Sequence, residues 1–391
     1  MSRLFIILSI FLFSTFAQAS QITTRFEHLS IEDGLSDDMV LSILQDSKGF
    51  LWFGTLNGLN RYDGYTFKVF RHDAKDSHSI SNSRIHTLFE DSKGRLWIGT
   101  GGRGKQNSGL DRFDADTQRF IHFKHNTTNP YSLGEGWVSS IVEDNKGILW
   151  VGTSSGGLNL FDESAGQFKR FIPSETKTKS LNTIHKDTKG NLWLGTPVGL
   201  YHFDIKQQHF SHYQYNETAP SSLSHNKVNA IHEDTKGNLW VGTSDGLNLF
   251  DVKTKQFKRF RHQDNDPHSL SDNLITSLFI DTSGTLWIGT AGGGLNQYDA
   301  QRNYFVHFEQ NNSVDSLSSN SVTSIHEDNQ GALWIGTNHG LSKLDRRKQQ
   351  FGHVKGLPSN PNSLSNNSIS AIYKDANDTL WVGTADGLYQ Y

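Results

Sequence analysis

Short apolar runs separated by polar, glycine-containing links recur along almost the whole chain. One period, taken from Asn320, reads NSVTSIHEDNQGALWIGTNHGLSKLDRRKQQFGHVK and contains the apolar segments VTSIHED, LWIGT, GLSKLD and QFGHV. Each segment is rich in β-branched and aromatic residues and is bounded by Gly, Asn, Asp or Ser, which is typical of short β-strands. No segment keeps a helical period. The pattern therefore predicts an all-β protein with four strands in each repeat.

The repeat is marked by the phrase LW-x-GT, which occurs eight times. The spacings between successive motif tryptophans are 45, 53, 43, 47, 47, 47 and 47 residues, at Trp52, Trp97, Trp150, Trp193, Trp240, Trp287, Trp334 and Trp381. Four short strands repeated at such a period indicate the blades of a β-propeller. We expect four-stranded antiparallel blades, with the tryptophan packed between neighbouring blades.

The number of blades depends on how the ring closes. The last repeat contains three strand segments, at 370–375, 380–384 and 387–391, and no fourth. Residues Thr24 to Leu29 match the fourth-strand pattern, so we expect this N-terminal strand to complete the last blade and close the ring. The regular spacing of the later repeats favours eight blades. Seven blades with one orphan repeat is the alternative.

The first residues have the features of an export signal. Arg3 precedes an apolar run from Leu4 to Phe16, and Ala17-Gln18-Ala19 forms a small-x-small cleavage site. We expect a signal peptide at 1–19, cleavage before Ser20, and a periplasmic propeller over 20–391. The alternative is an uncleaved anchor, which the short apolar run makes less favourable. The chain has no cysteine and a formal charge of −3, so neither disulfides nor a nucleic-acid footprint are expected.

The phrase LW-x-GT-x-x-GL-x-x-[YF]-D and the opening FEHLSIEDGLSDDMVLSILQDSKGFLWFGTLNGLNRYDGYTF resemble the two-component regulator propeller repeat over residues 26–391. The resemblance implies a periplasmic sensor domain of hybrid two-component histidine kinases or of related membrane diguanylate cyclases, with an oligosaccharide or other small ligand. Family members usually continue into a small β-sandwich, a transmembrane helix and a cytoplasmic signalling module, which this sequence lacks. We expect either a truncated receptor or a free-standing binding protein with a membrane-bound signalling partner.

Several recurring residues are expected to serve the scaffold. An aspartate three residues before a glycine recurs between the first and second strands, which indicates capping of a tight turn. Calcium binding is a weaker alternative, since no carboxylate-rich loop accompanies these turns. The histidines also recur at strand positions, in the first strand (His185, His232, His326) and in the fourth (His122, His212, His307, His353). No catalytic, metal or cofactor motif is present, so no enzyme activity and no cofactor are expected.

Binding specificity is expected on the face that varies between repeats. Directly before each first strand comes a residue that should face the mouth of the central channel, here named the mouth residue: Met39, Arg84, Trp137, Ser180, Lys227, Leu274, Ser321 and Ser368. Links between second and third strands add further polar residues, and an insertion at 101–108 adds two basic ones. The resulting candidate ligand site comprises Trp137, Arg84, Lys227, Arg103, Lys105, Asn57, His339, Asp245 and Met39.

Trp137 is the one tryptophan outside the LW-x-GT motif. An indole face suits a sugar ring, and the basic residues suit carboxylate or sulfate groups. The alternative is that Trp137 packs under the insertion and that the basic residues are ordinary surface. The predicted function is a periplasmic ligand-sensing module. A protein-interaction scaffold and, less favoured, a carbohydrate-active enzyme are the alternatives.

Overall fold

The computed structural model describes residues 24–102, 104–172, 178–347, 368–375 and 379–390, with only the backbone described for 104–107. The chain divides into a larger compact unit, Arg25–Asp345, and a smaller one that contains the last repeat. The signal peptide expected at 1–19, the fourth strand predicted near 350–354 and His353 lie outside the described residues. Each unit is considered by itself.

The larger unit contains seven antiparallel four-stranded sheets, which we number as blades 1 to 7. In chain order, the strands of each blade from the inside outward are as follows: blade 1, β2 (Val40–Gln45), β3 (Leu51–Thr55), β4 (Gly58–Tyr62) and β5 (Phe67–Phe70); blade 2, β6 (Ile85–Glu90), β7 (Leu96–Gly102), β8 (Gly104–Asp114) and β9 (Arg119–Lys124); blade 3, β10 (Val138–Glu143), β11 (Leu149–Thr153), β12 (Gly157–Asp162) and β13 (Gln167–Phe171); blade 4, β14 (Thr183–Lys186), β15 (Leu192–Thr196), β16 (Gly199–Asp204) and β17 (His209–Tyr213); blade 5, β18 (Val228–Glu233), β19 (Leu239–Thr243), β20 (Gly246–Asp251) and β21 (Gln256–Phe260); blade 6, β22 (Ile275–Ile280), β23 (Leu286–Thr290), β24 (Leu295–Asp299) and β25 (Tyr304–Phe308); blade 7, β26 (Val322–Glu327), β27 (Leu333–Thr337), β28 (Leu341–Leu344) and β1 (Glu27–Leu29).

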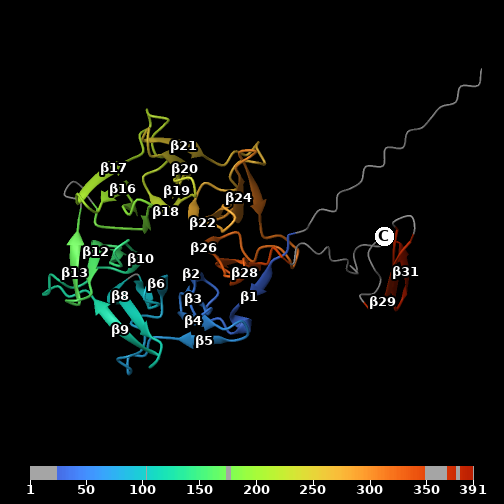
Figure 1. Cartoon of the computed structure of the whole chain (residues 1–391), viewed down its shortest axis with the longest axis horizontal. Helices are drawn as coiled ribbons and strands as arrows, with labels where there is room; N and C mark the ends of the chain where they lie inside the picture. The colour runs from blue at the N-terminus through green and yellow to red at the C-terminus, as the bar shows by residue number, and fades with distance from the viewer. Residues whose placement is uncertain (1–23, 103, 173–177, 348–367, 376–378, 391) are drawn as a thin grey trace, which may run out of the picture. The chain divides into compact units, whose positions relative to one another are not determined.

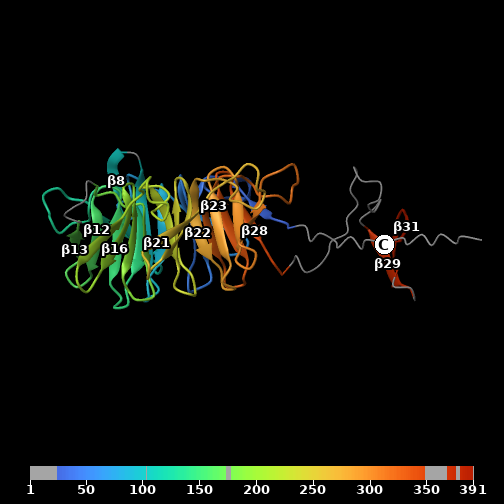
Figure 2. The ribbon, with the colours of Figure 1, turned by 90° about the horizontal axis from the view of Figure 1, so that it is seen from above.

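The seven blades form a closed ring (Figure 1). Each inner strand contacts the inner strand of the next blade, from β2 through β6, β10, β14, β18 and β22 to β26, and β26 contacts β2 again. Seen from the side, the ring is a flat disc from which the β7–β8 hairpin of blade 2 projects on one face (Figure 2). The all-β propeller predicted from the repeats is therefore confirmed.

The N-terminal strand closes the ring at a different place from the one predicted. β1 pairs with β28 in the seventh repeat, with Glu27 opposite Lys343 and Leu29 opposite Leu341. The preceding Phe26 is 5% exposed and belongs to the same core cluster as Trp287. The predicted pairing with the last repeat is wrong, and seven blades plus an orphan repeat is the arrangement in the described residues. The reason is that β1 fills the outer edge of blade 7 and then runs through a short 3-10 helix (Ile31–Asp33) directly into blade 1.

The eighth repeat forms a separate three-stranded sheet of β29 (Ile369–Lys374), β30 (Leu380–Thr384) and β31 (Gly387–Gln390). It keeps the repeat chemistry, since the Trp381 indole donates to Asp375 at 3.0 Å. Several of its apolar residues are nevertheless exposed: Leu388 is 67% exposed, whereas the equivalent Leu295 in blade 6 is 0% exposed. The eighth sheet is thus a blade in sequence and strand pairing, with three strands among the described residues.

A hydrogen bond between tryptophan and aspartate recurs in every repeat. The indole Nε1 donates to the aspartate of the turn between first and second strands over 2.7–3.3 Å, in the pairs Trp52–Asp46, Trp97–Asp91, Trp150–Asp144, Trp193–Asp187, Trp240–Asp234, Trp287–Asp281, Trp334–Asp328 and Trp381–Asp375. The other carboxylate oxygen accepts backbone N–H groups of the turn, as Asp144 does from Lys146 and Ile148. Turn capping by aspartate and packing by tryptophan were both expected. Their direct coupling was not.

Three half-buried histidines, His185, His232 and His326, lie on the inner strands β14, β18 and β26 near the turn end of the ring. His185 and His232 contact each other with ring centroids 5.4 Å apart, and Phe279 separates His232 from His326. Burial lowers the pKa of His185 to about 3 and that of His326 to about 4, and it also lowers the pKa of His232. These imidazoles are therefore neutral in the folded protein at pH 7.

The Trp–Asp bond predicts the effect of removing one carboxylate. In Asp144→Asn the amide nitrogen would meet the Trp150 N–H, donor against donor, so we expect unfolding free energy to fall by about 1–3 kcal/mol. Asp162→Asn is the matched control, because Asp162 caps a turn through Ser164 and Ala165 and has no tryptophan partner. Denaturant unfolding of both variants measures the difference. Equal losses would show that the indole contact contributes nothing.

The histidines predict a loss of stability in acid. Their folded-state pKa values lie below the unfolded value of about 6.5, so the unfolded chain takes up more protons as pH falls below that value. Their contribution to the unfolding free energy is fully present above about pH 6.5. It is lost as pH falls toward the folded-state pKa values, by about 1–2 kcal/mol per histidine between pH 7 and 5. We expect His185→Phe/His232→Phe, which copies the phenylalanine that blade 6 has at the same position, Phe279, to melt with a shallower pH dependence than the unsubstituted chain. The exposed His209→Gln should leave that dependence unchanged, and identical slopes in all three proteins would contradict the account.

Candidate functional site

The mouth residues and the links between second and third strands meet at one end of each blade. In blade 2 the Gly101 N–H donates to the Arg84 carbonyl at 3.0 Å, and in blade 3 the Ser154 N–H donates to the Trp137 carbonyl at 3.0 Å. Blades 5, 6 and 7 repeat this bond at Lys227, Leu274 and Ser321. The structure therefore places these predicted residues on one face of the disc, the face from which the β7–β8 hairpin projects.

Arg84 and Trp137 come together at the junction of blades 2 and 3. Between them lies His86, two residues after Arg84 on β6, whose ring stacks on the Trp137 indole with centroids 5.7 Å apart and an interplanar angle of 24°. Two glycines of β7 permit the approach: a Cβ on Gly101 would lie 2.5 Å from the Ser108 Oγ and 2.8 Å from the Trp137 Cβ. Gly101 also has φ +131°, a conformation that L side chains rarely adopt. We name Arg84, His86, Ser108 and Trp137 the junction cluster.

The junction cluster contains buried polar atoms without a hydrogen-bond partner. These are Arg84 Nε, His86 Nε2 and Ser108 Oγ. Each such atom costs roughly 1–3 kcal/mol when nothing replaces its bond to water. Burial, and then the charge of Arg84, lower the pKa of His86 to about 4, so its imidazole is neutral at pH 7 and one ring nitrogen carries a proton. Arg84 and Ser108 can thus donate to a ligand, whereas His86 Nε2 is an acceptor, because the other imidazole nitrogen bonds the Gly101 backbone.

The corresponding positions elsewhere serve the ring itself. In blades 4 to 7 the residue two positions after the mouth residue bonds a carbonyl of the next blade, in the pairs Asn182–Val228, Asn229–Ile275, Thr276–Val322 and Thr323–Val40. Blade 2 has His86 at this position, which makes no such bridge. The sequence reasoning missed His86 because it treated the histidines as recurring strand residues. Aligning the eight repeats would have shown that this position holds histidine only in blade 2.

The packing alternative for Trp137 describes part of its environment. The Trp137 Cβ lies close to Gly101, at the base of the inserted hairpin. The side chain is nonetheless only half-buried, as are Arg84 and His86. Trp137 is therefore both wedged beside the hairpin and accessible from the face, and the two interpretations do not exclude each other.

The other predicted residues lie elsewhere on the same face. Lys227 is exposed in blade 5, Asn57 and His339 are exposed in blades 1 and 7, and Met39 is half-buried in blade 1. Asp245 is paired with Arg261 at 2.8 Å and is committed to that ion pair. Arg103 lies outside the described residues, and for Lys105 only the backbone, in β8, is described. The structure thus gathers Arg84 and Trp137 and leaves the remaining candidates as separate surface positions.

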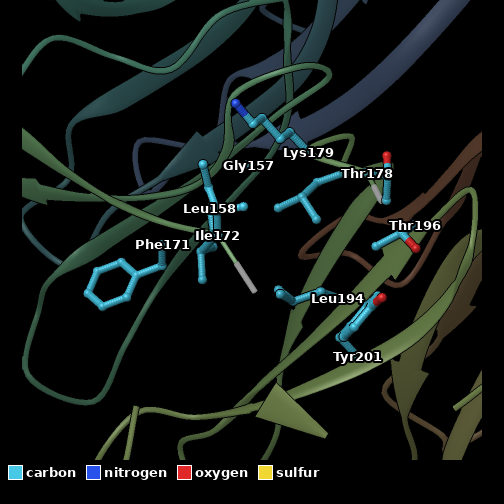
Figure 3. Close-up of a pocket in the computed structure, with 10 residues that line it drawn as sticks. Gly157, Leu158, Phe171, Ile172, Thr178, Lys179, Leu194, Thr196 and Tyr201 are labelled. Carbon is cyan, nitrogen blue, oxygen red and sulfur yellow. The ribbon is translucent and has the colours of Figure 1, made fainter. Parts of the chain in front are cut away.

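A small apolar cavity lies between blades 3 and 4 (Figure 3). Other junctions are filled by a leucine or isoleucine from the loop that leads into the next blade, at Leu35, Ile80, Leu133, Leu223, Leu270 and Leu317, each at most 4% exposed. No described residue of the loop leading into blade 4 takes that role, and Leu158, Leu194 and Tyr201 line the space that remains. The cavity measures about 10 Å³, which is room for roughly one water molecule. It is a packing gap rather than a ligand pocket.

A wider hollow of about 590 Å³ lies on the outer rim between blades 2 and 3. Its polar lining is largely engaged within the protein. His122 contacts the buried Asp111 at 2.7 Å, which raises the pKa of His122, and Ser132 Oγ bonds the backbone of its own loop. The equivalent loops of other blades repeat this arrangement. The hollow is therefore a feature of the common repeat, whereas the junction cluster is formed by residues that differ between repeats.

The described residues lack two features that would indicate other kinds of function. They contain no group of three or more His, Cys, Asp or Glu side chains placed to hold a metal ion. They also contain no helix that is long and apolar enough to cross a membrane.

The repeats match a known family. The family model described as "Two component regulator propeller" matches residues 34–57, 79–102, 132–155, 222–245, 269–292, 316–339 and 363–386. Blade 4, whose loop lacks the usual leucine, lies between the third and fourth of these spans. The chain belongs to the two-component regulator propeller family.

Solved structures show where such propellers occur. The extracellular domain of the hybrid two-component system BT3049 from B. thetaiotaomicron is 28% identical, with a TM-score of 0.75 over 94% of this chain and 48% of that one. The extracellular domain of BT4673 from the same organism, at 22% identity and TM-score 0.66, shares the fold, as does streptogramin B lyase at 13% identity and TM-score 0.62.

Among curated proteins, "Histidine kinase P4" of Formosa agariphila is 44% identical over 78 residues, which are 19% of this chain and 6% of that protein. The chain therefore spans about half the length of the first structural relative and a small part of the curated one. The chain is similar to the propeller-containing extracellular domain of a two-component system.

Proposed function

We propose that the chain is the ligand-sensing part of an extracytoplasmic two-component receptor and that it binds an oligosaccharide at the junction of blades 2 and 3. The observation that carries the site is the junction cluster, where a half-buried indole lies beside unpartnered hydrogen-bond donors. An aromatic face with adjacent polar groups suits a sugar ring, which has an apolar side and a hydroxyl-bearing edge. The family and the extracellular relatives support the role of sensor.

The proposed signal is a change in how the propeller sits against a membrane-bound signalling partner. A ligand changes such an equilibrium only by binding the two arrangements with different affinity. The face that holds the junction cluster also carries the projecting β7–β8 hairpin, so a ligand bound there would alter the surface that a partner meets. Histidine kinase or diguanylate cyclase output, and export by the N-terminal signal peptide, belong to this proposal.

A glycan array followed by calorimetry on the variants tests the site. Trp137→Leu takes the residue that blade 6 has at the same position, Leu274, so the fold should be retained. We expect affinity for the best glycan to fall at least about tenfold, the loss of roughly 1.4 kcal/mol of stacking. Lys227→Ser, which takes the residue found in blade 7, is the control on another part of the face and should bind normally.

Equal affinity in Trp137→Leu and the unsubstituted chain would contradict the proposed site. Binding of proteins but of no glycan would favour the interaction scaffold instead, and turnover of a bound glycan would favour the carbohydrate-active enzyme.

A further inference from the structure

The junction cluster brings together three buried polar atoms that have no hydrogen-bond partner, Arg84 Nε, His86 Nε2 and Ser108 Oγ. Five other buried side-chain atoms lack a partner in the described part of the chain, and two of these are Ser139 Oγ on β10 and His185 Nε2 on β14. The other three, in Ser42, Ser277 and Ser324, belong to the scaffold. Each of them lies where a Cβ on the facing motif glycine would be only 2.2–2.4 Å away, which is a repeated strand contact. The partnerless atoms of Arg84, His86 and Ser108 follow no such repeat.

The positions of these polar atoms converge on one place. Arg84 directly precedes β6 and His86 is the second residue of that strand, at the bulge between Ile85 and Thr87, where the charge of Arg84 acts on the imidazole. The Arg84 Nη1 lies 4.0 Å from where a Cβ of Gly102 would be, and Ser108 Oγ lies beside Gly101 on the paired hairpin strand. The indole of Trp137 covers the His86 ring from blade 3.

Arg84 brings a positive charge to this place. Among the described residues Arg84 has no ion-pair partner, whereas Arg95 and Arg261 pair with carboxylates. A half-buried arginine gains from a ligand that supplies a counter-ion. The planar guanidinium fork matches the planar carboxylate, with which it forms two parallel hydrogen bonds.

From these observations we infer that the junction cluster recognises a uronic acid residue of an oligosaccharide. Arg84 binds the carboxylate, Ser108 donates to a carboxylate oxygen, His86 Nε2 accepts from the neighbouring hydroxyl, and Trp137 supports the sugar ring. This inference rests on the proposed function and adds the charge of the sugar to it.

The test compares uronate-containing oligosaccharides with the same molecules after reduction of their carboxyl groups. Pectic, alginate, glucuronoxylan and hyaluronan oligosaccharides are titrated into the full chain by calorimetry, together with sulfated oligosaccharides. We expect at least one uronate oligosaccharide to bind and its carboxyl-reduced form to bind at least tenfold more weakly.

Two variants locate the effect. Arg84→Met takes the mouth residue of blade 1, Met39, and His86→Asn takes the residue of blade 4, Asn182, so both should melt as the unsubstituted chain does. Arg84→Met should lower the affinity for the uronate ligand at least tenfold and leave the affinity for the carboxyl-reduced ligand unchanged. His86→Asn should weaken the uronate ligand less than Arg84→Met does.

The outcomes separate the two proposals. If neutral oligosaccharides bind as well as uronates, with dependence on Trp137 but not on Arg84, the uronate inference is wrong and the proposed sensor site stands. Binding of sulfated sugars alone also overturns the uronate assignment. If no oligosaccharide of either kind binds, both proposals fail.

Discussion

The pairing of β1 with β28 is the constraint on which the rest of the structure depends. A propeller ring closes when its last blade is complete, and here that blade takes its outer strand from the N-terminus. The same segment continues into blade 1, so blades 7 and 1 share one stretch of chain. Bonds between their inner strands complete the closure, including one from the Gln45 N–H to His326 Nε2 at 3.2 Å. Closure at seven blades fixes the spacing of the inner strands and hence the distance between Arg84 and Trp137.

Within the ring, repetition separates scaffold from specialisation. A bond that occurs in every repeat, such as the one from the Trp150 indole to Asp144, serves what all repeats share. Residues that differ from the common repeat pattern are therefore informative, and blades 2 to 4 contain most of them. Blade 2 has the hairpin insertion and His86, blade 3 has Trp137, and the loop into blade 4 lacks the buried leucine. Only the first two of these differences place polar groups at an accessible surface, which is why the site is assigned there rather than to the cavity between blades 3 and 4.

The sequence was sufficient for the fold because its signals are local. Strand length, turn aspartates and the LW-x-GT motif each act within one repeat, and the structure has them where the pattern predicts. The number of blades, in contrast, depends on contacts between segments that are far apart in the sequence. The outer edges of the seventh and eighth repeats expose similar backbone donors and acceptors, so the fourth-strand pattern of residues 24–29 fits either. What decided between them was the burial of Phe26 in the core of blade 7 and the short path from β1 to β2, neither of which strand patterns reveal.

The candidate site was predictable in part for the same reason. Arg84 and Trp137 are unusual at positions that the repeats make comparable, so the sequence could single them out. Their convergence depends on the bulge at the start of β6 and on Gly101 and Gly102, which are features of backbone geometry. The same argument explains why Lys227 and Asp245 were chosen with equal justification but lie apart from the cluster. Sequence gives the set of variable residues, and ring geometry selects which of them meet.

Thermal unfolding of two shortened chains tests the closure most directly. A chain that ends at Asp345 lacks the eighth repeat, and a chain that begins at Ser30 lacks β1. The seven-bladed account predicts that the first melts cooperatively within about 2 °C of the chain that begins at Ser20, while the second melts lower by more than about 5 °C, as loss of a core phenylalanine and an edge strand implies. A ring that collapses when residues 346–391 are removed, yet tolerates removal of β1, would contradict it.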